Sequence, residues 1–161
     1  MCTTSFGTVE TQVGTLTVIV SPRGVRRIVL PSDDAECAIR ETGARPGPIG
    51  PVREQLAEYF AGARSNFVVL LDLDGLPPFR TTVLRALQHV PFGETITYRG
   101  LAVAVDNPGA VRAVGTACAR NPLPLLIPCH RVVRSDGSLG NYLGGVEAKQ
   151  RLLELESAAA P

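Results

Sequence analysis

The hydrophobic and polar positions of the first thirty residues predict a β-hairpin. Residues 14–20 and 25–30 are rich in valine, isoleucine, leucine and threonine, and Ser21-Pro22-Arg23-Gly24 between them has the residues of a tight turn. Residues 43–51 are rich in glycine and proline, so we expect a loop there.

Helical spacing follows this loop. One face of the predicted helix carries Val52, Leu56, Tyr59 and Phe60, and Gly62 ends it. Residues 67–73 form a short apolar run that predicts a buried strand. Residues 74–78, Asp-Gly-Leu-Pro-Pro, suit neither a strand nor a helix, so we expect two domains, residues 1–75 and 76–161.

The second half of the chain has the pattern of three helices. The first has apolar residues at helical spacing and ends at residues 91–93; these residues are Val83, Leu84, Leu87 and Val90. Thr97 can cap a short second helix that runs through Val105. With Asn107 as its N-cap and Pro108 at its first helical position, the third helix is predicted to run to about Ala119. The short connection between the second and third helices predicts a helix-turn-helix.

The third helix has a core-facing stripe and a small, nearly uncharged outer face. The stripe is Val111, Val114, Gly115 and Cys118, whereas the outer face holds Gly109, Ala110, Arg112, Ala113 and Thr116. Small residues suit close approach to a minor groove better than base reading in a major groove. An ordinary amphipathic helix pair would show the same pattern.

A thiol stands beside an imidazole at the centre of this half. Residues 123–127 are strongly apolar and predict a buried strand, and Cys129-His130-Arg131 follows. A nucleophilic cysteine needs a lowered pKa, which the two cationic neighbours favour. Adjacent side chains of an extended segment point apart, so a water or a local turn would relay the proton, and Glu156 is a candidate to orient the imidazole. The alternative is a buried structural cysteine beside a surface histidine.

The charge and the cysteine content of the chain exclude few classes of protein. The net charge is +1, but the stretch from residue 98 to 134 holds five basic side chains against Asp106, namely Arg99, Arg112, Arg120, Arg131 and Arg134. A loop-rich solvated face could show that excess by chance. The four cysteines lack a C-x-x-C pair and there are only two histidines, so we expect reduced thiols and no metal site. No apolar run is long enough to span a membrane and the first residues lack signal-peptide features, so a cytoplasmic protein is expected.

The sequence around the thiol resembles a known family, the O6-alkylguanine-DNA alkyltransferases, also called methylated-DNA–protein-cysteine methyltransferases. The resemblance rests on residues 112–115 (Arg-Ala-Val-Gly), 121–122 (Asn-Pro), 127–133 (Ile-Pro-Cys-His-Arg-Val-Val) and 140–142 (Gly-Asn-Tyr). It extends from Phe79 to Glu156 and includes residues 91–95 and Tyr98, whereas the N-terminal half matches only in general layout.

The resemblance implies an α/β fold with two parts: a small N-terminal sheet-plus-helix domain that is RNase H-like, and a C-terminal winged helix-turn-helix domain. It implies direct reversal of DNA damage, in which Cys129 irreversibly takes the alkyl group from O6 of guanine in duplex DNA, with O4 of thymine as a second candidate position. The protein would be consumed after one reaction and would need no cofactor. Its partner would be double-stranded DNA containing O6-alkylguanine, bound by a monomer that could assemble cooperatively.

The family also implies roles for individual residues. His130 would act as a base through water, oriented by Glu156, and Tyr98 would donate a proton to the guanine. Asn121 would brace the turn after the recognition helix, and Arg112 would fill the space left by the flipped nucleotide. The remaining DNA contacts would come from Gly109, Ala110, Ala113, Thr116 and Arg131, and the base pocket from Val132, Tyr142, Leu143 and Gly144. Leu143 departs from the small or hydroxylated residue common in the family, which would narrow the pocket.

Two other functions share these features. A non-reactive sensor of alkylated bases would keep the DNA face but typically lacks the cysteine. A winged-helix regulator would bind undamaged duplex at a specific sequence and would tolerate the loss of Cys129.

Overall fold

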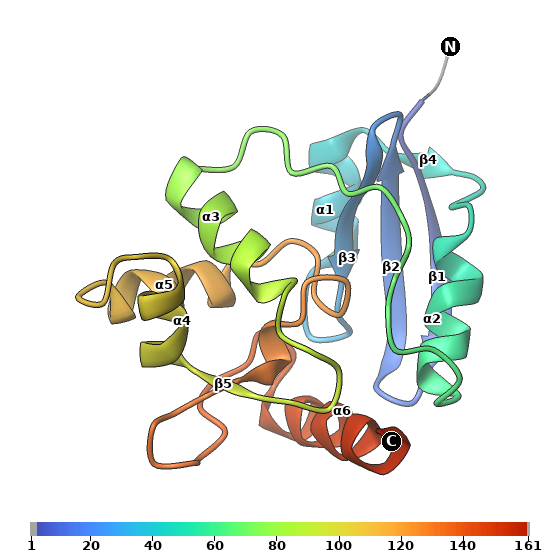
Figure 1. Cartoon of the computed structure of the whole chain (residues 1–161). Coiled ribbons are helices and arrows are strands. Elements are labelled where there is room, and N and C mark those ends of the chain that lie inside the picture. The colour runs from blue at the N-terminus through green and yellow to red at the C-terminus, as the bar shows by residue number, and fades with distance from the viewer. Residues whose placement is uncertain (1–2, 161) are drawn as a thin grey trace. The chain divides into compact units, whose positions relative to one another are not determined.

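The computed structural model describes residues 3–160 as a mixed α/β protein (Figure 1). The chain divides into two compact units between Leu73 and Asp74, and each unit is considered by itself. Within residues 3–160, no helix is long and apolar enough to cross a membrane.

The first unit contains a four-stranded sheet in the order β3-β2-β1-β4. Strands β1 (Ser5–Thr11), β2 (Gly14–Ser21) and β3 (Gly24–Val29) are consecutive and antiparallel, and the short β4 (Arg45–Pro46) pairs parallel with β1. The predicted hairpin is confirmed by β2 and β3. Gly24 has a φ of 143°, and a Cβ there would overlap the Leu70 carbonyl, so the turn needs a glycine.

Two helices pack on opposite faces of this sheet. Helix α1 (Ala35–Thr42), which the sequence pattern did not reveal, begins where the Asp34 carboxylate accepts a hydrogen bond from the Cys37 amide at 2.9 Å. It packs on the face that carries Phe6, Ile19 and Val29. Helix α2 (Val52–Phe60) matches the prediction, and its start lies on the other face, where Gly7 approaches Ile49 and Arg53.

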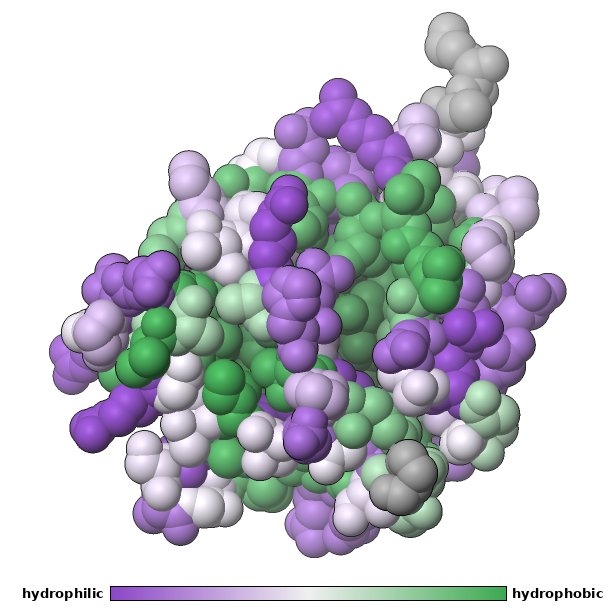
Figure 2. Space-filling model, viewed as in Figure 1, coloured by the Kyte–Doolittle hydropathy of each residue, from purple (hydrophilic) through white to green (hydrophobic). Residues whose placement is uncertain are grey.

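The predicted strand over residues 67–73 is wrong, because the segment forms a single bridge, Val25 with Leu71. The Gln55 side chain takes the place of a neighbouring strand: its Oε1 accepts from the Val68 amide at 2.8 Å and its Nε2 donates to the Val68 carbonyl at 3.1 Å. Val68 and Leu70 consequently point outward, 76% and 77% exposed, and Figure 2 shows apolar side chains at the surface over this segment.

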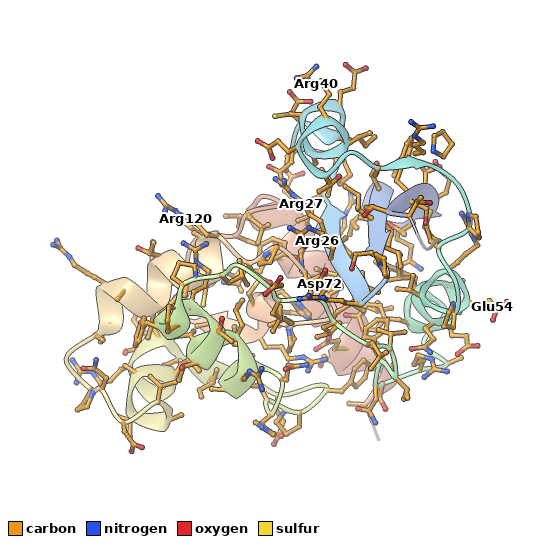
Figure 3. The ribbon with its side chains drawn as sticks, turned by 90° about the horizontal axis from the view of Figure 1, so that it is seen from above. Arg26, Arg27, Arg40, Glu54, Asp72 and Arg120 are labelled. Carbon is orange, nitrogen blue, oxygen red and sulfur yellow. The ribbon has the colours of Figure 1, made fainter. Side chains whose placement is uncertain are left out.

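The end of this segment is fixed by a buried carboxylate. Asp72 accepts hydrogen bonds from the Ser21 hydroxyl at 2.6 Å and from Arg26 at 3.1 Å (Figure 3). Asp72 is 6% exposed, so its charge requires these donors.

The second unit is mainly helical. Helices α3 (Pro78–Leu87), α4 (Tyr98–Ala104) and α5 (Val111–Ala119) pack against one another. The strands β5 (Ile96–Thr97) and β6 (Val132–Val133) form a short parallel pair, and the last helix, α6 (Val146–Ala159), packs on a 3-10 turn, η1 (Cys129–Arg131). The predicted first helix is confirmed, but it ends at Leu87, so that Val90 lies beyond it. The Thr97 cap is also confirmed, since the Thr97 hydroxyl accepts from the Gly100 amide at 2.9 Å.

The predicted start of the third helix is wrong by several residues. Asn107 to Ala110 form a closed turn, in which the Ala110 amide donates to the Asn107 carbonyl at 3.0 Å, and α5 begins at Val111. Asp106 adopts a φ of 57°, which ends α4 and redirects the chain before Pro108 can enter a helix.

Replacing Gln55 by leucine tests the role of its side chain. We expect the free energy of unfolding to fall by about 1–3 kcal/mol, because both backbone groups of Val68 lose their partners, and we expect residues 67–73 to become the first site of proteolysis. Urea denaturation and limited proteolysis measure these effects. The control is Glu54→Gln, an exposed neighbour on α2 (Figure 3), and equal stability of the two variants would contradict this role.

Candidate active site

The candidate nucleophile lies on a turn that is reached by a loop, and the predicted strand over residues 123–127 is wrong. Pro122, Pro124 and Pro128 have no amide proton to give to a sheet, and Leu125 has a φ of 76°. The aliphatic side chains of this segment are nevertheless buried, as expected. The segment is therefore a compact apolar loop beneath the cysteine.

Asn121 closes this loop. Its Nδ2 donates to the Ile127 carbonyl at 2.8 Å, and its Oδ1 accepts from the Leu123 amide at 2.9 Å. Both bonds are buried, so the side chain supplies the pairing that a strand would otherwise provide. The loop in turn fixes where η1 begins.

Behind the cysteine, one carboxylate joins two residues of η1 to helix α6. Glu156 Oε1 lies 2.7 Å from His130 Nε2, and Glu156 also accepts two bonds from Arg131, each at 2.9 Å. Arg131 donates a third bond to the Val90 carbonyl at 2.7 Å. Burial opposes ionisation of the carboxyl, but the hydrogen bonds from His130 and Arg131 outweigh it and lower the pKa of Glu156 to about 2.

The ionised Glu156 determines the tautomer of His130. Burial lowers the pKa of His130, and the carboxylate offsets only part of that shift, so the imidazole is neutral near neutral pH. Because an ionised carboxylate only accepts, Nε2 carries the proton and Nδ1 has the free lone pair. Among residues 3–160, Nδ1 has no hydrogen-bond partner although it is buried, so this nitrogen is the base available in the site.

Cys129 is 3% exposed, and its thiol is protonated in the free protein. Burial raises the pKa of Cys129 to about 11, although the Asn121 side chain and the Lys149 ammonium act in the opposite direction. The predicted lowering of this pKa is therefore wrong: Arg131, the expected cationic neighbour, is bound to Glu156 instead. A base must remove the proton before the sulfur can attack.

Lys149 is a site residue that the sequence analysis missed. Its ammonium is buried and donates to the carbonyls of Val132 at 2.6 Å, Leu139 at 2.5 Å and Asn141 at 3.2 Å. It therefore ties the loop after β6 to helix α6. The signal was available, because Lys149 is the only lysine in the chain and shares a helical face with Leu152 and Glu156.

Cys129 opens onto a cavity of about 720 Å³. Helices α4 and α5 and the loop of residues 134–143 line it, with Tyr98, Arg99, Val111, Arg112, Gly115, Thr116, Cys118, Ala119, Cys129, Arg134, Ser135, Asn141, Tyr142 and Leu143. This volume can hold a purine base with its substituent. Cys118, expected in the core, is buried yet also reaches the cavity wall.

The predicted site residues divide into three groups. Tyr98, Cys129, Tyr142 and Leu143 meet at the cavity, and Asn121, His130 and Glu156 lie behind it. The residues predicted to contact DNA lie at the surface of the protein. Gly109, Arg112, Ala113 and Thr116 are exposed, and Ala110 is half-buried.

Two predicted sets need correction. Arg131 does not belong to the DNA face, because its guanidinium is buried against Glu156 and Val90. Val132 and Gly144 are not part of the cavity wall formed by the described residues, and the Val132 carbonyl already accepts from Lys149.

These features define a mainly helical domain in which a cysteine faces a cavity and a buried histidine–glutamate pair lies behind it. The comparisons identify the family. The family model for the DNA-binding domain of 6-O-methylguanine DNA methyltransferase matches residues 78–158. A methylated-DNA–protein-cysteine methyltransferase of Mycolicibacterium paratuberculosis is 37% identical over 97% of this chain and 94% of its own length. The constitutive enzyme of that name in Bacillus subtilis is 37% identical over 94% of each chain.

Solved structures give the same result. The O6-methylguanine methyltransferase of Mycobacterium tuberculosis matches with a TM-score of 0.88 and 36% identity, over 98% of this chain and 95% of that one. A second structure of the Mycobacterium tuberculosis protein, in complex with DNA, matches with a TM-score of 0.89 over the same shares. The chain belongs to the methylated-DNA–protein-cysteine methyltransferase family, which confirms the resemblance found in the sequence.

Replacing Glu156 by glutamine tests the buried cluster. Near neutral pH we expect the variant to lose about 3–5 kcal/mol of stability, because Arg131 keeps its buried charge without a counter-ion. The pKa of Glu156 is lowered on folding to about 2, so its stabilisation is full above the unfolded value of about 4.3 and is lost as the pH falls through about 2. The gap between wild type and variant should therefore shrink over that window.

Denaturation of both proteins across this pH range measures the gap. The exposed Glu154→Gln on the same helix is the control and should follow the wild type. A gap that stays constant down to pH 2 would contradict the assigned pKa.

Proposed function

We propose that this protein repairs DNA by direct reversal, moving an alkyl group, chiefly methyl, from O6 of guanine in duplex DNA to the sulfur of its own Cys129. The observation that carries the proposal is the Cys129 thiol in a purine-sized cavity with the His130–Glu156 pair behind it, in a chain of this family. The new C–S bond is a thioether, which no described side chain is placed to cleave. Each molecule would therefore act once, and O4 of alkylated thymine is a second candidate substrate position.

His130 is the proposed base and Glu156 its positioning residue. The thiol proton would pass through a water to His130 Nδ1, whose lone pair is free because Nε2 donates to Glu156. The thiolate would attack the alkyl carbon as the bond to O6 breaks. Asn121 would support the reaction indirectly by holding the loop beneath Cys129.

Tyr98 is the proposed acid. Burial raises its pKa, with the nearby Cys118 and Cys129 thiols adding to the shift and Arg134 opposing it, so the phenol keeps its proton near neutral pH. The ring lines the cavity, and the hydroxyl lies 3.5 Å from the Asn141 carbonyl. A proton given to a ring nitrogen would neutralise the guanine as it leaves.

Helices α4 and α5 are proposed to form a helix-turn-helix, with the β5–β6 pair as part of a winged domain and the sheet unit as an RNase H-like domain. The proposed domain limits are residues 1–75 and 76–161; the compact units divide two residues earlier. The exposed face of α5 would enter the minor groove, and Arg112 would hold the space of a nucleotide flipped into the cavity. Gly109, Ala110, Ala113 and Thr116 would form the rest of that contact.

The cavity wall suggests limits on the substrate. Tyr142 and Leu143 would flank the base, with Gly144 keeping the loop close. Leu143 leaves less room than a serine or glycine, so small alkyl groups are favoured over benzyl-sized ones. A monomer that acts in the cytoplasm, with cooperative assembly on DNA, completes the proposal.

Intact-protein mass spectrometry tests the function. After mixing with duplex DNA that carries one O6-methylguanine, we expect the protein mass to rise by one methylene unit, located on the Cys129 peptide. Cys129→Ser should show no gain. Tight binding without a mass change would favour the non-reactive sensor instead. A protein that fails both to bind this DNA and to accept the methyl group would refute the proposal.

The same assay, followed over time, tests the assigned roles. His130→Gln and Tyr98→Phe should each slow transfer by about 10²–10⁴-fold, the usual effect of losing a proton-transfer group. Unchanged rates would remove the corresponding role while leaving Cys129 as acceptor.

Gly115 tests how closely DNA approaches α5. The sequence pattern placed Gly115 in the core-facing stripe, but in the structure it is half-buried and lines the cavity beside the proposed DNA face. A Cβ at this helical glycine would meet nothing within 4 Å, so the protein's own packing does not require it. Gly115→Ala should raise the stability by about 0.5–1 kcal/mol and yet weaken binding to methylated duplex. Gly100→Ala is the contrast, because its Cβ would crowd Thr97 and Ile96 and should lower stability. Unchanged DNA affinity in Gly115→Ala would argue against close approach of DNA to α5.

A further inference from the structure

The structure separates the five arginines of the basic stretch into three environments. Arg131 is buried and bound to Glu156. Arg120 is exposed at the end of α5 and is not part of the cavity wall (Figure 3). Arg99, Arg112 and Arg134 are exposed and line the cavity. The excess positive charge is therefore concentrated at one opening.

Arg99 and Arg134 reach this opening from different elements. Arg99 belongs to the first turn of α4, beside Tyr98, and Arg134 follows β6. The Arg134 stem and the Tyr98 ring pack next to Gly140, where a Cβ would lie 3.5 Å from Arg134 Cγ and 3.3 Å from the ring. A closed turn holds the backbone of Arg134, whose amide donates to the Ser138 carbonyl at 2.9 Å and whose carbonyl accepts from the Gly137 amide at 3.0 Å.

Neither guanidinium is held in an ion pair by the part of the chain that the structure describes. Within residues 3–160, neither Arg99 nor Arg134 forms an ion pair, whereas Arg26, Arg27, Arg64 and Arg131 all do. Asp136 lies close to Arg134 in the chain, but Ser138 binds its carboxylate through both amide and hydroxyl, at 2.9 and 2.7 Å. Two exposed, planar cations that form no ion pair among the described residues, at the edge of one cavity, are suited to binding an anion.

We propose that Arg99 and Arg134 form a phosphate-binding subsite at the cavity mouth, which grips the backbone of the nucleotide whose base enters the cavity. This inference rests on the proposed function. When a base is extruded it turns about its backbone, so its two flanking phosphates stay outside the pocket that receives the base. Guanidinium groups bind phosphate bidentately and without sequence preference. The subsite would hold the flipped nucleotide in place while Arg112 occupies the stack.

Salt dependence of DNA binding tests the subsite. Each phosphate contact contributes about 0.9 to the slope of log K against log salt. In a Cys129→Ser background, which prevents reaction, we expect Arg99→Gln and Arg134→Gln each to flatten this slope by about 0.9, and the double variant by about 1.8. Fluorescence anisotropy with a labelled duplex containing O6-methylguanine measures it. The exposed Arg120→Gln is the matched control and should keep the wild-type slope.

A second measurement separates phosphate binding from damage to the cavity. With Cys129 present, the double variant should slow methyl transfer from the methylated duplex more than transfer from the free base O6-methylguanine, which has no phosphate. Asp136→Asn removes a nearby negative charge and should not weaken binding. Three results would each overturn the inference: an unchanged salt slope in the double variant, an equal flattening of the slope in Arg120→Gln, or a slowing of transfer from the free base as large as that from DNA. Failure of the wild type to transfer from DNA would instead refute the proposed function.

Discussion

The site depends on one shared carboxylate. Glu156 lies on the last helix and binds both His130 and Arg131. This one residue sets the tautomer of the His130 imidazole, provides the counter-ion of the buried Arg131 guanidinium and attaches η1 to α6. Arg131 extends this connection to the Val90 carbonyl beyond α3. The position of the thiol thus follows from electrostatics in a buried place, where an unmatched charge is costly. The bonds that stabilise the fold of this unit are therefore the same bonds that position the Cys129 thiol.

The proposed reacting groups of the site are neutral, whereas charged side chains lie at the surface around the cavity opening. The thiol, the imidazole and the phenol are all neutral in the free protein because burial disfavours their charged forms. The arginines at the cavity opening are exposed. In the proposed mechanism the rim would attract DNA, while the reacting groups would acquire charge only when proton transfer begins.

The sequence predicted those parts of the molecule that depend on local pattern. The β2–β3 hairpin, α2 and the Thr97 cap follow from side-chain periodicity and turn chemistry, and the cysteine motif located the site. Several errors arise where a polar side chain binds a group that the apolar pattern does not reveal. Gln55 takes the backbone groups of Val68, Asn121 closes an apolar loop that resembles a strand, and Glu156 withdraws Arg131 from the surface. No periodicity encodes such bonds, and the left-handed backbone of Asp106 and Leu125 is equally hidden.

Lys149 gives the folded protein an unusual chemical property. It is the only lysine of the chain, and its amine is enclosed by three carbonyls. Reagents that acylate amines, enzymes that conjugate proteins to lysine and proteases that cut after lysine all need that side chain to leave its place. Any lysine-directed modification of the intact chain must therefore wait until the loop of residues 139–141 detaches from α6, which makes this one amine an internal reporter of whether the active site is assembled.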